Sequence, residues 1–433
     1  MTPITRLSTL AVGAVALTLA VAGCTDNATP AGAGTLNVTI TDTTCQVSAA
    51  QAPSGTVNFE VKNTGTVANE FEILAADKLR IVVEKENIGP GTTVQVTTAM
   101  AEGTYYTACK PNMVGDLVGV TEFKVTPGAQ VQVSDDVKQL QDKAVDSYTD
   151  YIKDQAGALL TNTQKFAQAY AAGDTETAKR LYPLARMYFE RIEPTAEAFG
   201  ISEPGDLDAA LDRRIQDVAL EANAQVTDPA VLAQWHGWHR MEADLFSAAG
   251  SAYKITDPAA RQAEADQLVT NTQTLYDLVS GKRTGADGKP FAVTLADINH
   301  GAGALMEEVA KGKIVGEEET FSHTDLYDFQ ANLEGAQVAY GNVQDIVKKK
   351  DPSLDTEITQ RFATIAALLQ KQQTGTAADG SPTYPDYSTI AAVQKEAGEV
   401  PNEAAYTPVQ REFSDGVNAV SESLSKVAAV VLN

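Results

Sequence analysis

Several kinds of residue are scarce in this 433-residue chain, and each scarcity excludes a class of function. Basic clusters are nearly missing: Lys348-Lys349-Lys350 is the one run that stands out, and the formal net charge is −24. This balance argues against nucleic acid or anionic lipid headgroups as partners. No nucleotide-binding glycine loop occurs, and no Ser-His-Asp or Cys-His pairing indicates a nucleophilic enzyme. Histidine occurs four times and never within residues 1–235.

No hydrophobic run is long enough to span a membrane. The longest one lies at the start of the chain and resembles a lipoprotein leader. Arg6 precedes an apolar run over residues 10–22, which is too short to span a membrane. The run ends in Val21-Ala22-Gly23-Cys24, which resembles a bacterial lipobox, where cleavage exposes a cysteine that carries lipid. We therefore expect a signal peptide over residues 1–23, lipid on Cys24 and a flexible tether over residues 24–34. The mature chain would be extracytoplasmic and lipid-anchored at the cell membrane.

Two cysteines remain in the mature body, Cys45 and Cys109. Outside the cytoplasm, two thiols that meet normally oxidise. The residues alone leave two alternatives open, a disulfide or a pair of soft metal ligands.

The chain divides into a strand region and a helical region. In residues 35–129, apolar and polar residues alternate with period two and turn signals separate the runs, which predicts a small all-β sandwich. The expected strands lie at residues 36–40, 57–61, 71–74, 79–83, 92–97 and 118–125. In residues 130–433 the apolar period becomes helical, as in Leu181, Ala185, Tyr188 and Ile192, which predicts an all-α bundle.

One helical stretch, residues 235–246, contains both tryptophans and two of the four histidines. His239 and Glu242 are three residues apart, so on a helix they share a face, beside an apolar stripe that includes Trp238 and Met241. Such a pair at the edge of a core can be half of a metal site. The alternative is a structural histidine satisfied by a surface glutamate.

A second stretch carries stacked acidic residues. Arg186, Glu190, Glu193 and Glu197 fall on one face of the predicted helix. An Arg186–Glu190 pair on a wet surface would contribute only a few tenths of a kcal/mol. Three acids on one stripe repel each other unless a cation lies among them, so Glu190 and Glu193 are candidate ligands facing His239 and Glu242. Oxygen-rich ligation suits iron, manganese or calcium better than copper or zinc.

The segment Gly237-Trp238-His239-Arg240-Met241-Glu242 resembles the GxHxxE motif of the imelysin family. Residues 188–194, 312–319 and 322–332 match further blocks of that family. With residues 86–91 and 108–113 of the strand region, the whole mature chain is similar to the EfeO family of iron-uptake lipoproteins. Several separate blocks in both regions make this resemblance far more specific than the His-x-x-Glu pair alone.

The resemblance implies a multidomain fold, an N-terminal cupredoxin-like sandwich followed by an imelysin-type helical bundle. It also implies two partners, a membrane iron permease and a secreted haem-dependent dye-decolourising peroxidase. The metal site carried over from the family consists of six residues: Glu190, Glu193, Asp208, His239, Glu242 and Glu308. The stretch between Asp208 and His239 is longer than the family pattern, and loop lengths also affect the alignment of Glu308.

The strand region departs from blue-copper proteins, whose last loop carries Cys, His and Met. Here that loop contains Cys109 and Met113 but no histidine, and no histidine precedes residue 236, so an ordinary blue-copper site is excluded. Either Cys45 and Cys109 form a disulfide, or Glu70, Cys109, Met113 and Cys45 bind copper or iron in a modified site.

Together with the residues, the resemblance implies an iron-binding, non-enzymatic lipoprotein that passes iron to a permease in an EfeUOB-type uptake system. The alternative is a zinc metallopeptidase of the imelysin type. An inverted H-x-x-E-H zinc motif would need histidine at residue 243, which is Ala243.

Overall fold

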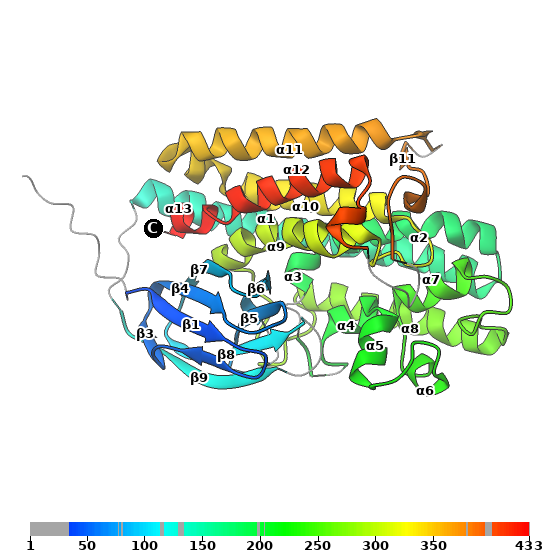
Figure 1. Cartoon of the computed structure of the whole chain (residues 1–433), viewed down its shortest axis with the longest axis horizontal. Coiled ribbons are helices and arrows are strands. Elements are labelled where there is room, and N and C mark those ends of the chain that lie inside the picture. The colour runs from blue at the N-terminus through cyan, green and yellow to red at the C-terminus, as the bar shows by residue number, and fades with distance from the viewer. Residues whose placement is uncertain are drawn as a thin grey trace, which may run out of the picture. The chain divides into compact units, whose positions relative to one another are not determined.

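The N-terminal region is a sandwich of two β-sheets, shown in blue and cyan in Figure 1. The computed structural model describes residues 34–76, 78, 81–112, 117–128, 134–196, 200–202, 204–377, 380–394 and 401–432. One sheet has the order β2-β1-β4-β7 and the other β3-β9-β8-β5-β6. The strands are β1 (Leu36–Ile40), β2 (Cys45–Val47), β3 (Gln51–Pro53), β4 (Gly55–Asn63), β5 (Asn69–Leu74), β6 (Ile81–Ile88), β7 (Thr93–Met100), β8 (Gly103–Pro111) and β9 (Val118–Thr126).

Alternation along the strands forms the sandwich core, as the sequence predicts. Val57, Phe59 and Val61 of β4 are fully buried between the sheets. The prediction missed the short strands β2 and β3, and it missed β8, in which Ala108 and Cys109 are consecutive buried residues and no clean alternation occurs. In the sheet, β8 lies between β5 and β9 and is hydrogen-bonded to both.

The described residues from 134 onward are mainly helical, as predicted, apart from one short strand pair that an all-α bundle does not include. The helices are α1 (Asp135–Ala171), α2 (Thr175–Glu190), α3 (Glu193–Ala196), α4 (Leu207–Asp212), α5 (Ile215–Glu221), α6 (Pro229–Leu232), α7 (Trp238–Phe246), α8 (Pro258–Val279), α9 (Leu295–Lys311), α10 (Asp325–Lys350), α11 (Pro352–Gln372), α12 (Pro408–Leu424) and α13 (Val427–Leu432). Single 3-10 turns are η1 (Lys313–Val315), η2 (Tyr387–Thr389) and η3 (Glu403–Ala405), and β10 (Gly375–Thr376) pairs with β11 (Pro382–Thr383).

The long helix α1 packs against α2, α8 and α10, and α9 packs against α10 and α12. Local signals fix where some helices begin: Thr294 and Asp297 form a capping box at the start of α9. No helix of the described residues combines the length and the apolar character needed to cross a membrane.

The sandwich contacts the helical region through α9. Residues 32–433 form one compact unit. Lys85 of β6 pairs with Glu307, and His300 Nε2 lies 2.8 Å from the carbonyl oxygen of Thr97 in β7. Burial lowers the pKa of His300 to about 4, so its neutral ring donates this hydrogen bond at physiological pH. These contacts place the acidic side chains at the end of α9 beside β6.

Candidate metal centre

Helix α7 holds His239 and Glu242 in a fixed orientation. Its N-cap, Gly237, has φ +92°, and a Cβ there would lie 2.2 Å from the carbonyl oxygen of Leu211, so only glycine lets α7 start against α4. Trp238 and Met241 are fully buried in the core. His239 and Glu242, which are 2% and 0% exposed, occupy the adjacent face of α7.

Glu242 makes hydrogen bonds with both of its carboxylate oxygens. Oε1 accepts from the backbone N–H groups of Phe321 at 2.9 Å and Ser322 at 2.7 Å. Oε2 lies 3.2 Å from His239 Nδ1, which leaves Nε2 of that ring 3.4 Å from Asp212 and 3.3 Å from Glu318. Glu242 therefore orients the imidazole toward the other acids of the site.

Helix α2 brings Arg186 and Glu190 into the interior. Both side chains are fully buried, so the alternative of a wet surface pair is wrong. The predicted continuous helix is also interrupted. Helix α2 ends at Glu190, and α3 begins at Glu193. Pro194, the second residue of α3, has no N–H to donate to a continuing helix. Glu190 and Glu193 nevertheless converge on the same cation, Lys313.

Lys313 is a fully buried lysine in the single turn η1. Its Nζ lies 2.7 Å from Glu190 Oε2, 2.8 Å from Glu193 Oε2, 3.6 Å from Glu308 Oε1 and 3.8 Å from Glu318 Oε2. A buried ammonium requires such partners, because desolvation of an unpaired charge costs several kcal/mol.

Arg186 is the second buried cation, and its guanidinium pairs with acids from several elements. Nε lies 2.8 Å from Glu319 and 3.8 Å from Asp328, and Nη2 lies 2.9 Å from Glu318. Two further pairs join it to Asp212 and Glu190. Arginine suits this position since its planar group presents several donors in fixed directions.

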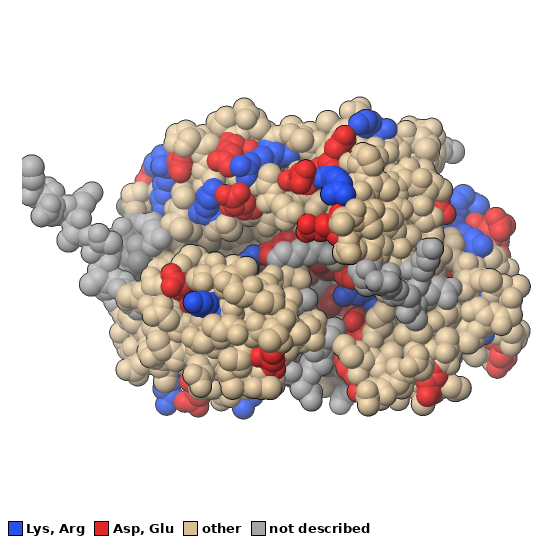
Figure 2. All heavy atoms as spheres, in the orientation of Figure 1, with Lys and Arg blue, Asp and Glu red and all other residues tan. Residues whose placement is uncertain are grey.

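Three overlapping groups of side chains could hold a metal ion, each with ligand atoms within 4.8 Å of one another. They are Asp212, His239 and Glu318; His239, Glu242 and Glu319; and Glu190, Glu193, Asp212 and Glu318. Figure 2 shows acidic side chains, with basic ones among them, lining a hollow in the middle of the visible face. The ligand set, carboxylate oxygens with one imidazole nitrogen, suits a hard cation such as iron or manganese.

The electrostatics divide these acids into two kinds. Burial opposes ionisation of Glu190, but Lys313 and Arg186 outweigh it and lower its pKa. Burial likewise opposes ionisation of Glu318, and Lys313 with His239 holds its pKa well below the usual range. By contrast, burial and neighbouring carboxylates raise the pKa of Glu193 well above its usual range.

His239 is positively charged in this surrounding. Its burial favours the neutral ring, but Asp212 and the hydrogen bonds with Glu242 and Glu318 raise its pKa to about 10. A metal that binds Nε2 must therefore displace a proton from this ring.

Sequence comparison identifies the family. The sequence model of the imelysin family matches residues 144–414, and that of the cupredoxin-like domain matches residues 12–119. An "Efem/EfeO family lipoprotein" of Staphylococcus aureus (strain MRSA252) is 34% identical over 68% of this chain and 87% of its own length. One of the same name from Staphylococcus haemolyticus (strain JCSC1435) is 36% identical over 66% of this chain and 83% of its own length. The chain belongs to the Efem/EfeO family.

The Efem/EfeO lipoprotein fold brings together four of the six predicted ligands, Glu190, Glu193, His239 and Glu242. Glu308 lies at the rim, 3.6 Å from Lys313, and burial raises its pKa to about 8. Asp208 belongs to none of the three groups found among the described residues. Asp212, one turn further along α4, belongs to two of these groups.

Sequence reasoning missed five further residues of the centre: Arg186 as a buried hub, Asp212, Lys313, Glu318 and Glu319. The block at residues 312–319, which resembles the family, was the available signal for the last three. Asp212 was visible only as one of several acids in α4, whose burial depends on the packing of that helix against α7.

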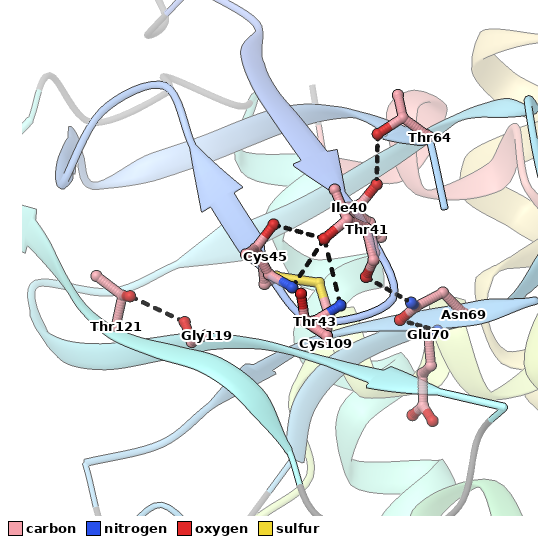
Figure 3. The surroundings of a disulfide bond; sticks show 11 residues. Ile40, Thr41, Thr43, Cys45, Thr64, Asn69, Glu70, Cys109, Gly119 and Thr121 are labelled. Atoms are coloured by element: carbon pink, nitrogen blue, oxygen red, sulfur yellow. Dashed lines mark hydrogen bonds between the residues drawn. A yellow bond between two sulfur atoms is a disulfide. The ribbon is translucent and has the colours of Figure 1, made fainter. Parts of the chain in front are cut away.

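Of the two alternatives for the sandwich, the structure shows the disulfide. Cys45 and Cys109 are joined in a disulfide, which leaves neither sulfur as a thiolate for copper or iron (Figure 3). Glu70 pairs in register with Lys110, next to Cys109, so strand alternation places it on the opposite face of the sheet. Figure 3 shows its carboxylate pointing away from the disulfide. Met113 lies outside the described residues, as does the predicted lipidation site Cys24 and its leader.

Proposed function

We propose that this chain captures iron outside the cell membrane and passes it to a membrane iron permease. The observation that carries the proposal is the sharing of ligands among the three groups. Asp212, His239 and Glu318 each belong to more than one group, so one ion can exchange ligands without leaving the centre. A cargo site must bind and also release, and shared ligands allow both.

The choice of iron rests on ligand chemistry and on the family. The three groups contain carboxylates and a single histidine, with no thiolate, which favours a hard cation over copper(I) or zinc. The relatives are named lipoproteins. A lipid on Cys24 of this chain would likewise keep the centre close to a permease in the same membrane. A secreted haem-dependent dye-decolourising peroxidase is the second proposed partner.

Calorimetric titration of the mature chain with ferrous iron under anaerobic conditions, and with ferric citrate, tests the binding step. We expect saturable binding in at least one oxidation state, and its loss in the double variant Glu193→Gln with His239→Gln. His236→Gln is the matched control, because His236 pairs with Glu264 at 3.0 Å and belongs to none of the described groups. Undiminished binding in the double variant would refute this centre.

The delivery step is tested separately, by radioactive iron uptake in cells that express the permease. Uptake should depend on the wild-type chain and fall to the background of cells without it when the double variant replaces it. Uptake that is independent of the chain would contradict a role in delivery even if the centre binds iron.

The alternative, a zinc metallopeptidase, finds less support in the geometry. Catalytic zinc usually has three protein ligands and an open position. His236 is turned toward Glu264, and residue 243 is a fully buried alanine, so His239 is the one imidazole of the described centre. Release of peptides from a denatured protein mixture, blocked by a chelator, would favour this alternative.

A further inference from the structure

Lys313 stands among the carboxylates that would hold the metal. Three of its four carboxylate partners, Glu190, Glu193 and Glu318, belong to the group of four that could bind a cation. Its ammonium therefore lies where it competes with a metal for the same oxygen atoms. No other lysine of the described residues makes ion pairs with members of the three groups.

The backbone that follows Lys313 is held by hydrogen bonds from three other residues. The carbonyl oxygen of Ile314 accepts hydrogen bonds from Tyr387 Oη at 2.9 Å and from Gln410 Nε2 at 2.8 Å. The carbonyl oxygen of Val315 accepts from the backbone N–H of Gln394 at 2.7 Å. The turn is thus anchored, and the ammonium can leave the carboxylates only by rotation of its own four-carbon side chain.

Lys313 and Arg186 differ in how they could respond to a metal. Arg186 pairs with acids on several sides through a rigid planar group, so it cannot move away without leaving most of them unpaired. Lys313 has a flexible stem, and its contact with Glu308 lies toward solvent, since that side chain is 29% exposed. Rotation toward Glu308 would keep the ammonium in contact with a carboxyl oxygen, which can accept its hydrogen bond.

We propose that Lys313 is a tethered counter-cation, which iron displaces from Glu190, Glu193 and Glu318 when it binds. This inference rests on the proposed function. In this arrangement Lys313 keeps the acids together without metal, and its competition weakens iron binding. The ammonium returns as the ion leaves, which favours release of the cargo.

The test compares Lys313→Met with the wild-type mature chain, with iron in the oxidation state that the wild type binds. Without the competing ammonium, we expect the dissociation constant to fall about tenfold or more and iron to leave more slowly in a stopped-flow chelator assay. Iron should also raise the melting temperature more than it does in wild type, because the metal then replaces a missing charge. Lys371→Met is the control, since Lys371 is exposed and pairs with Glu412 at the surface.

An affinity that is unchanged or weaker in Lys313→Met would overturn the inference while leaving the proposed function intact. If wild type itself binds no iron, the proposed function fails, and the inference with it.

Lys313→Gln keeps an N–H donor without the charge, and its iron affinity should change in the same direction. If both variants fold only when iron is added, the metal replaces the ammonium, as proposed. If iron does not restore their folding, Lys313 has a structural role that a metal cannot fill, and the inference is wrong.

Discussion

Lys313 Nζ lies 2.7 Å from Glu190 Oε2, and both side chains are fully buried. The two residues are 123 positions apart, so their contact joins the end of α2 to the turn after α9. A buried glutamate with a lowered pKa next to a buried ammonium is a charged pair that persists at neutral pH. Under the proposed function, the acids around this pair, which outnumber the fixed cations, are what would bind a further positive ion.

Arg186 is expected to be the residue on which the stability of the centre depends most. Arg186→Met leaves several buried carboxylates without their cation, and breaking buried ion pairs from one side costs about 3–5 kcal/mol. Urea unfolding of the metal-free protein should show this loss. Arg180→Met, at an exposed position of the same helix, is the control and should change stability by less than about 0.5 kcal/mol. Equal losses of stability in the two variants would contradict the central role of Arg186 in holding the buried acids together.

Asp212 and Asp208 offer a matched test of the ligand assignment, because both lie on α4. Asp212→Asn should weaken iron binding by about tenfold or more, since an amide is a poorer ligand for a hard cation than a carboxylate. Asp208→Asn should leave the affinity within about twofold. Titration calorimetry distinguishes them, and the reverse order of effects would restore Asp208 as the ligand.

Asp325 predicts how stability depends on pH. Burial, with Glu242 nearby, raises its pKa from 3.8 to about 8. Between these values the folded chain keeps a proton that the unfolded chain has lost, so the free energy of unfolding falls as pH rises from about 4 to 8. One such proton changes stability by up to about 1.4 kcal/mol per pH unit.

Asp325→Asn cannot titrate and should flatten this dependence. Urea unfolding at several pH values, with a chelator present, measures the slope. Asp345→Asn, at an exposed position of the same helix α10, should keep the wild-type slope. Parallel curves for wild type and Asp325→Asn would show that Asp325 is ionised in the folded chain at neutral pH.

The disulfide predicts that the stability of the sandwich can be lowered without a change in iron binding. Cys45 and Cys109 are 64 residues apart, and closing a loop of that length stabilises a fold by about 4 kcal/mol in the chain-entropy account. Replacing both by alanine should lower the unfolding temperature of the sandwich. Iron binding should be unchanged, because neither cysteine belongs to the three groups of the centre. A parallel loss of iron affinity would implicate the sandwich in holding the metal.

The sequence alone determined those features that depend on neighbours along the chain. Period-two and helical patterns gave the order of a sandwich followed by a helical region, and the three-residue spacing placed His239 and Glu242 on one face of α7. Glu190 and Glu193 were identified because acids stacked on one stripe require a positive partner. These predictions succeed because hydrogen bonding and side-chain direction in a helix or strand are set within a few residues.

Only the tertiary structure decided which distant side chains share a buried space. It placed Asp212 rather than Asp208 within the three groups, joined Cys45 to Cys109, and brought Lys313 to Glu190. Spacing along the sequence cannot distinguish a solvated acid from a buried one, since burial depends on which helix faces pack together. The charge of each group then follows from that burial, because the cost of leaving water is what forces lysine, arginine and carboxylates to pair.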